Sequence, residues 1–148
     1  MNNREIFETY DEVLGLSQCV IFYKTKGGVT LTAVGQATCH PKDEQFKSKL
    51  TGSIIAEYRA EIALLRQIND YELKPGIVAL KHVYCTMRHS KSFDPKSYEC
   101  VRIKRELAHL LDELEENKMA IKSIQDCLHT YLEEKDKAWR KFEQKGQD

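Results

Sequence analysis

The amino-acid sequence predicts an α+β fold, in which a small N-terminal α-β-β-α(-β) unit precedes a long C-terminal coiled-coil-like helix. Two strand-like runs flank a Gly-Gly pair, an amphipathic pattern spans residues 53–68, and a heptad pattern without Gly or Pro fills residues 96–145. The chain has 148 residues, which is roughly the length of one domain. We expect the α/β unit in residues 1–93 and the long helix, as an oligomerisation element, in residues 94–148.

The clearest local signal is a β-hairpin. Residues 19–24 (CVIFYK) and 29–39 (VTLTAVGQATC) are rich in β-branched and aromatic side chains, and the residues between them have turn chemistry. The second run alternates Val29, Leu31 and Ala33 with threonines, so one face of that strand should be buried. His40-Pro41 is expected to end the strand, because proline cannot extend a ladder of hydrogen bonds.

The other elements are predicted from residue spacing. Residues 4–14 carry an apolar stripe closed by Gly15, which is typical of a helix. Residues 53–68 form an amphipathic helix that Lys74-Pro75-Gly76 should end. Residues 77–87 (IVALKHVYCTM) are predicted as a third strand, and Asp94-Pro95 as the start of the long helix, with Asp94 as its N-cap.

The long helix carries apolar residues at the a and d positions of a heptad, with polar exceptions at Asn117 and Lys135. Leu111, Leu132 and Trp139 flank these positions. A helix of this length measures roughly 75 Å, so it must fold back, pack on a partner, or both. We expect self-association; the alternative is a helix bent at residues 115–117 that packs on its own domain. The expected oligomer contacts are Leu107, Leu110, Leu114, Ile121, Ile124, Leu128 and Tyr131.

Charge is unevenly distributed, although the whole chain is neutral with 23 basic and 23 acidic residues. Residues 73–105 hold eight basic and two acidic side chains, and residues 106–116 hold five acidic and no basic ones. Aromatic residues lie among the cations, and this mixture suits a ligand that has phosphates and a base. The candidate ligand-binding or nucleic-acid-binding residues are Arg59, Lys81, Tyr84, Arg88, Lys91, Phe93, Tyr98, Arg102, Lys104 and Arg105.

Other interpretations of the basic segment stay open. Its cations are also typical of a solvated surface that pairs with acids in a neighbouring turn, or of a contact with a protein partner. The acidic segment 106–116 of a second copy is one such partner, and that contact would favour antiparallel pairing of the long helices.

No motif for catalysis or for a cofactor is found. Cys39-His40 lacks the second ligand pair of a zinc site, and His82 and Cys85 would face opposite sides of the predicted strand. The glycines match no phosphate-binding loop, and no serine elbow occurs. We therefore predict a protein that is not an enzyme, with no catalytic residue, metal or cofactor.

Composition favours a cytoplasmic protein. No apolar run approaches the ~20 residues of a membrane span, and acidic residues occupy the N-terminal region where a signal peptide is basic. The five cysteines are odd in number and scattered, which favours reduced thiols over a disulfide framework.

Residues 29–67 carry a strand followed by Gly-x-Ala-x-Cys-His-Pro-x-Asp, then by Phe, Gly and Ala-x-x-Arg-Ala. This pattern resembles a module of small accessory proteins from phages and prophages of Gram-positive bacteria, and less closely the phage anti-defence proteins that sequester cyclic signalling nucleotides. It covers about a quarter of the chain and transfers no ligand residue; the lysines that follow Asp43 depart from it. The matching positions are Gly35, Ala37, Cys39, His40, Pro41, Asp43, Phe46, Gly52, Ala56, Arg59 and Ala60.

The resemblance implies a phage-type accessory protein in the cytoplasm of a host cell. With the basic segment 74–105, it leads us to expect an antagonist of a host defence system that blocks a nucleoprotein or sequesters a signalling nucleotide. The alternative is a structural or assembly protein, in which the coiled-coil rod mediates oligomerisation and the α/β unit is a docking head. The expected partners are a second copy of the chain and a host protein, nucleoprotein or nucleotide; no membrane is expected.

Overall fold

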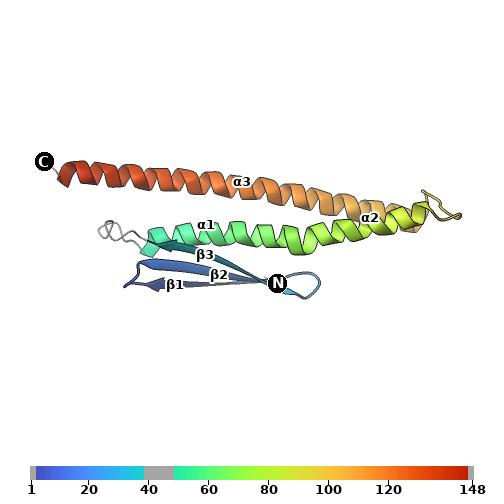
Figure 1. The fold of residues 1–148 in the computed structure, drawn as a ribbon, viewed down its shortest axis with the longest axis horizontal. Helices are drawn as coiled ribbons and strands as arrows, with labels where there is room; N and C mark the ends of the chain where they lie inside the picture. Colours follow the sequence, from blue (N-terminus) through green and yellow to red (C-terminus); the bar gives the residue numbers. More distant parts are fainter. Residues whose placement is uncertain (1–2, 39–48, 147–148) are drawn as a thin grey trace. The chain divides into compact units, whose positions relative to one another are not determined.

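The structure is a computed structural model that describes residues 3–38 and 49–146, and it confirms the α+β class and the long C-terminal helix (Figure 1). The chain forms three strands and then helices, so the predicted α-β-β-α(-β) order is wrong. The elements are β1 (Arg4–Asp11), β2 (Leu16–Lys24), β3 (Thr30–Thr38), α1 (Lys49–Ile68), the π-helical turn η2 (Asn69–Leu73), α2 (Lys74–Arg88) and α3 (Tyr98–Gly146).

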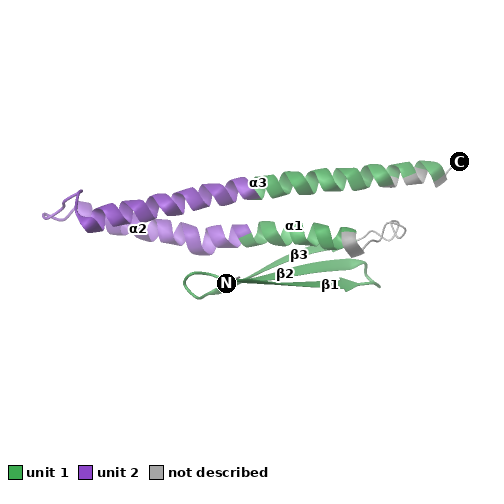
Figure 2. Ribbon diagram, turned by 180° about the vertical axis from the view of Figure 1, so that it is seen from behind, with its two compact units in different colours: residues 1–64, 121–148 green, residues 65–120 purple. Residues whose placement is uncertain are grey.

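The chain divides into two compact units (Figure 2). Unit 1 comprises residues 1–64 and 121–148, and unit 2 comprises residues 65–120. Unit 1 therefore holds the sheet, most of α1 and the C-terminal part of α3. Unit 2 holds the end of α1, η2, α2 and the first part of α3.

The segment predicted as a helix at residues 4–14 contains strand β1 instead. β1 pairs antiparallel with β2 along its whole length. Its apolar residues lie on both faces of the sheet, with Ile6 and Tyr10 on one face and Phe7 on the other, because successive side chains of a strand alternate. The apolar residues lie close together in the sequence because both faces of the strand carry them, and this spacing led to the incorrect prediction of a helix. Gly15, the predicted helix end, has a φ of 62° in the turn before β2.

The predicted hairpin is confirmed. β2 and β3 pair antiparallel in a sheet of order β1-β2-β3. Gly28 adopts a φ of 83° in the connecting turn, a conformation that favours glycine. Val29, which was predicted on the buried face, is 59% exposed. The buried residues of β3 are Leu31, Ala33, Gly35 and Ala37.

Small residues bring α1 very close to the sheet. A Cβ atom added to Gly35 would lie 2.1 Å from the carbonyl oxygen of Ala56 and 2.4 Å from the backbone nitrogen of Ala60. A Cβ atom added to Gly52 would lie 2.1 Å from the hydroxyl oxygen of Ser17. Gly52, Ala56 and Ala60 recur every four residues, so they form one stripe of α1 that contacts the sheet.

These small residues belong to the sequence motif noted in residues 29–67. Gly35 and the small-residue stripe of α1 explain part of that motif by packing alone, because larger side chains would separate helix and sheet. Five further motif residues, Cys39, His40, Pro41, Asp43 and Phe46, lie outside the described residues, and so does the predicted end of the strand at His40-Pro41.

Residues 74–88 form helix α2, so the predicted strand at 77–87 and the predicted helix end at residues 74–76 are both wrong. Pro75 lacks an N–H group, and in a regular α-helix its ring would clash with the carbonyl of Tyr71. The chain widens into η2 immediately before Pro75 and then continues as α2. We attribute the π-helical turn to this proline, because the wider turn moves the carbonyl away from the ring.

α3 begins at Tyr98 rather than at Asp94-Pro95. The hydroxyl oxygen of Ser97 accepts a 3.3 Å hydrogen bond from the backbone N–H of Cys100, so Ser97 is the N-cap. Asp94 accepts a 2.9 Å hydrogen bond from the backbone N–H of Lys96 in the turn before the helix. The predicted cap therefore stabilises the approach to α3.

The predicted heptad seam is the half-buried face of α3. Every a and d residue from Ile103 to Tyr131 is half-buried, and every b, c, e and f residue between them is exposed. Seam residues contact other helices of the chain, as Asn117 does with Asn69 and Tyr131 with Tyr58. The alternative of a helix bent at residues 115–117 is not observed, because α3 continues as one α-helix through these residues. Self-association through the seven predicted contact residues stays a prediction. Within the described residues, no helix has both the length and the apolar character needed to cross a membrane.

Candidate anion-binding surface of unit 2

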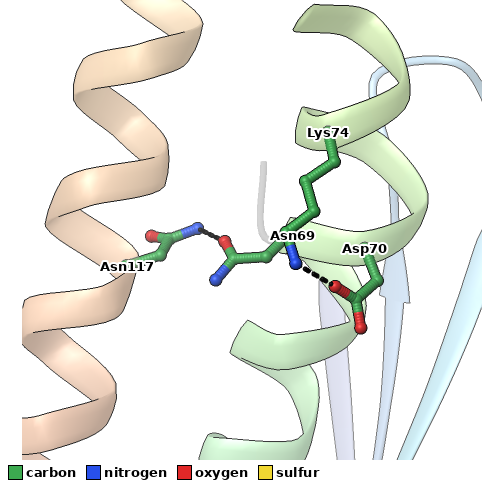
Figure 3. A network of polar contacts seen from close by, with 4 residues as sticks. All are labelled: Asn69, Asp70, Lys74 and Asn117. Carbon is green, nitrogen blue, oxygen red and sulfur yellow. Dashed lines mark hydrogen bonds and ion pairs between the residues drawn. The ribbon is translucent and has the colours of Figure 1, made fainter. Parts of the chain in front are cut away.

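Unit 2 is a helical hairpin, in which η2 and α2 run antiparallel to the first part of α3. Asn117 Nδ2 donates a 3.0 Å hydrogen bond to Asn69 Oδ1 (Figure 3). Further along, a Cβ atom added to Gly76 would lie 3.2 Å from a methyl group of Leu110, so the helices approach closely at this glycine. These two contacts fix which residues of the two helices face each other.

An aromatic pair lies near the loop that joins α2 to α3. The rings of Tyr84 and Phe93 pack edge to face with their centroids 6.2 Å apart, and both side chains are half-buried. The Lys104 ammonium lies over the Tyr84 ring, 5.4 Å from its centroid. Tyr84 therefore connects α2 with both the loop and α3.

Three cations surround Tyr84. Lys81 and Arg88 lie three residues before it and four residues after it on α2, so they are its neighbours on the helix surface. Lys104 reaches the same ring from α3. All three side chains are exposed, and in the described part of the chain neither Lys81 nor Arg88 forms an ion pair. We call Lys81, Arg88 and Lys104 the basic cluster.

The hairpin does not neutralise the basic cluster. No carboxylate lies three or four residues from any of its members, so the usual partners on a helix surface are missing. On α3, Lys104 comes directly after a seam residue and lies on one side of the seam. The acidic residues that recur every seven residues come directly before seam residues and lie on the opposite side, away from Lys104. Those acids are Glu99, Glu106 and Glu113.

Two other cations of the predicted segment are paired. Arg102 pairs with Glu106 at 3.1 Å, and this hydrogen bond raises the pKa of Arg102. Lys74 lies seven residues before Lys81 in the same column of α2, but it pairs with Asp70 at 2.8 Å (Figure 3). Lys91, Lys96 and Arg105 form no ion pair within the described residues either, so the basic cluster is distinguished by its arrangement around the Tyr84 ring.

The structure brings half of the predicted binding set together. Lys81, Tyr84, Arg88, Phe93 and Lys104 meet near the loop, whereas Arg59 belongs to unit 1, where its guanidinium donates a 2.6 Å hydrogen bond to the Gln36 carbonyl. The aromatic residues of the predicted set are Tyr84, Phe93 and Tyr98; the first two pack edge to face on each other, whereas Tyr98 is 74% exposed. The remaining predicted residues, all exposed in unit 2, are Lys91, Tyr98, Arg102 and Arg105.

The described residues contain no group of three or more His, Cys, Asp or Glu side chains that suits a metal ion. His82 and Cys85 lie on α2 rather than on a strand, and Cys39-His40 lies outside the described residues. The cysteines at positions 19, 85, 100 and 127 are free thiols.

The basic cluster has the clearest binding chemistry of the predicted residues, since it combines exposure, like charge and a fixed geometry around one ring. No known protein family, curated protein or solved structure matches this chain. The function is therefore inferred from the residues of the cluster themselves.

Proposed function

We propose that the protein acts by binding rather than by catalysis, and that its basic cluster binds the phosphate backbone of a nucleic acid, either free or within a host nucleoprotein. The observation that carries this proposal is the group of three exposed cations around Tyr84, with no carboxylate at helix-neighbour spacing. Like charges this close repel each other, and a polyanion relieves that repulsion while releasing its own counterions.

A nucleic-acid backbone fits this surface better than a single signalling nucleotide does. A nucleotide pocket needs a free aromatic face beside the cations, but at the cluster Tyr84 and Phe93 pack on each other, and Lys104 lies over the Tyr84 ring. The exposed aromatic residue of the predicted set, Tyr98, begins α3 at an f position, on the face directed away from the seam. Phosphates need only exposed cations, which the cluster provides. We therefore expect binding that depends weakly on base sequence, because backbone contacts position a protein without reading bases.

The resemblance of residues 29–67 to phage and prophage accessory proteins supports a target in a bacterial host. Occupying the nucleic-acid site of a defence nucleoprotein would block that complex without any chemical step. In this proposal unit 2 carries the binding surface, and the α/β unit stays available for a second contact.

The test is equilibrium binding to a fluorescently labelled DNA duplex, followed by anisotropy at low salt. The informative variant is Lys81→Gln with Arg88→Gln, which removes two unpaired cations but keeps the Lys104–Tyr84 contact. The control is Arg102→Gln with Arg140→Gln, which removes the same charge from cations paired at 3.1 Å with Glu106 and at 3.2 Å with Asp136.

We expect the cluster variant to bind roughly tenfold more weakly and the control to bind within about twofold of the unmodified protein. Equal losses in the two variants would show that only net charge matters and would overturn the cluster as a site. Absence of binding to both duplex and single-stranded DNA at low salt would overturn the proposed function and favour the structural or assembly role.

A further inference from the structure

The sheet of unit 1 has one covered face and one open face. α1 packs on the face that carries the buried residues Ile21 and Ala33 (Figure 1). Because successive side chains of a strand point to opposite faces, Phe7, Phe22 and Val34 lie on the other face. These three side chains are 52%, 37% and 43% exposed. We call this second face of the sheet the open face.

The apolar residues of the open face gather at its centre. Val20 pairs with Phe7 on one side and with Val34 on the other, so these three residues form one row across the sheet. In the next row, the Phe22 ring packs edge to face on Phe7 with the ring centroids 5.7 Å apart. Apart from Leu16, the other residues of the open face are polar: Glu5, Thr9, Asp11, Gln18, Lys24, Thr30, Thr32, Gln36 and Thr38. An apolar centre within a polar rim is the anatomy of a protein–protein interface.

Two exposed charges lie at equal distances from the central row. Lys24 follows Val20 by four residues on β2. Asp11 follows Phe7 by four residues on β1, so each charge lies about 13 Å from the row. Since β1 and β2 are antiparallel, the two charges lie toward opposite ends of the open face. The Asp11 carboxylate is held in place by hydrogen bonds of 2.9 and 3.1 Å from two backbone N–H groups of the following turn, and within the described residues neither charge forms an ion pair.

We propose that the open face binds a second copy of the chain, face to face, with the strands of the two copies antiparallel. A twofold axis that runs parallel to the central row, between the two sheets, generates this arrangement. It places the apolar row of one copy against the same row of the other. It also places Lys24 of each copy opposite Asp11 of the other, about one strand spacing (~5 Å) to the side, which a lysine side chain can span. This contact belongs to unit 1 and does not depend on the nucleic-acid proposal for unit 2.

The charges favour this arrangement over the other symmetric one. A twofold axis parallel to the strands would also pack the two open faces together, but it would place Lys24 of one copy against Lys24 of the other. Like charges that face each other across an interface weaken binding. The antiparallel arrangement instead forms two pairs of opposite charge, one at each end of the apolar row.

Both ends of the sheet carry apolar side chains that this arrangement covers. Val13 and Leu14, in the turn before β2, are 88% and 63% exposed, and Val29, in the turn before β3, is 59% exposed. The antiparallel arrangement brings each of these turns beside the other turn of the second copy. Leu16 of one copy then lies over a hollow of about 380 Å³ in the other copy, whose lining includes Phe22.

The size of the open face sets the strength of the contact. Three strands ~4.8 Å apart and about 30 Å long give a flat footprint of roughly 400 Å² per copy, which is smaller than the ~800 Å² that a standard interface buries on each partner. We therefore expect a weak dimer with a dissociation constant on the order of 10 µM. At about 1 µM such a dimer is mostly dissociated, so association through the leucines of α3 can be measured separately at that concentration.

The test is sedimentation equilibrium of the full chain at low salt, from about 1 to about 300 µM. Lys24→Glu and Asp11→Lys each place like charges opposite each other in the dimer. In an equimolar mixture of these two variants, both charge pairs of the mixed dimer are again opposite in sign. Val34→Lys tests the apolar row, because it places two lysines against each other at the twofold axis. The matched control is Lys122→Glu, which makes the same charge change at an exposed position of α3.

We expect the unmodified protein to dimerise, and Lys24→Glu, Asp11→Lys and Val34→Lys each to weaken the dimer by about tenfold or more. The mixture of the two charge variants should associate within about threefold of the unmodified protein, and Lys122→Glu should change nothing. A protein that stays monomeric at about 300 µM, a mixture as weak as its components, or an unchanged dimer with Val34→Lys would overturn the proposal. Circular dichroism checks that each variant is folded, and where Asp11→Lys is not, Lys24→Glu and Val34→Lys decide.

Discussion

Asn69 and Asn117 place a polar contact inside a largely apolar helix interface. Asn69 is 5% exposed, so its side-chain amide has lost most of its hydrogen bonds to water. The hydrogen bond from Asn117 compensates for part of that loss (Figure 3). A buried polar pair of this kind stabilises little by itself, but it selects one register, because slipping the helices would leave both amides unpaired.

Replacing one member of the pair tests that role. Asn117→Leu should lower the free energy of unfolding by about 2 kcal/mol, because it leaves the buried Asn69 amide without its partner. The double variant Asn69→Leu with Asn117→Leu should recover most of that loss. Urea unfolding of both single variants and the double variant gives the coupling energy, and strictly additive losses would show that the two amides do not act as a pair.

The sequence reveals some of these residues, but not their contacts. Asn117 stands out as a polar exception in the heptad, whereas nothing in the sequence identifies Asn69 as its partner. The basic cluster could be predicted only if residues 77–87 were assigned to a helix. On the predicted strand Lys81 and Tyr84 would face opposite sides, but on a helix the same spacing of three makes them neighbours.

Among the elements, η2 determines which side of α2 faces the helix interface. Across it the inward residues Asn69, Leu73 and Ile77 are spaced four and four apart, and only beyond Ile77 does the spacing alternate between three and four. A π-helical turn equals one inserted residue, so it carries Leu73 and Ile77 to the buried side. Without it, Glu72 would take the place of Leu73 in the interface.

Removing the extra residue should therefore convert the turn to regular α-helix. Deleting the 71%-exposed Tyr71 together with Pro75→Ala should cost no more than about 1 kcal/mol, because the interface then keeps a regular heptad and the proline clash is gone. Deleting Ala79 with the same Pro75→Ala change should cost about 3 kcal/mol or more, since it moves Tyr84 out of the interface. Thermal unfolding by circular dichroism compares the two, and equal stability would contradict this view of η2.

The secondary structure of some elements follows from their local sequence pattern, whereas that of others depends on tertiary packing. The β2–β3 hairpin has both strand composition and turn glycines, so the sequence predicted it correctly. Residues 77–87 look like a strand because of their valines, but Val78 and Val83 are 67% and 45% exposed on the outside of α2. The other face of α2 packs on α3, and this packing outweighs the preference of the valines for a β-strand. The local sequence pattern does not indicate this packing.

For the whole molecule, the a and d residues of the α3 seam are half-buried within the chain, and two leucines beside the seam are more exposed. Leu111 and Leu132 flank the seam and are 41% and 36% exposed, whereas Leu114 in the seam is half-buried. An oligomer built on α3 of the folded chain would therefore contact the flanking leucines first. This refines the predicted oligomer contact without testing it.

Two variants separate folding from association. Leu111→Glu with Leu132→Glu should leave the helix content unchanged and yield a monomer, because both side chains lie at the surface of the folded chain. Leu114→Glu should lower the free energy of unfolding by about 3 kcal/mol, since it buries a charge in the seam. Light scattering and circular dichroism measure the two effects; an oligomer that survives the first change, or a seam that tolerates the second, would contradict this assignment.

The chain has no net charge, yet it carries a local basic cluster. The most direct test of the proposed function of this cluster is the salt dependence of DNA binding. Each phosphate contact should contribute about 0.9 to the slope of the logarithm of affinity against the logarithm of salt concentration. We predict that Lys81→Gln with Arg88→Gln flattens that slope by about 2, while Arg102→Gln with Arg140→Gln leaves it unchanged. Identical slopes for the unmodified protein and both variants would contradict the central claim that the cations around Tyr84 bind phosphates.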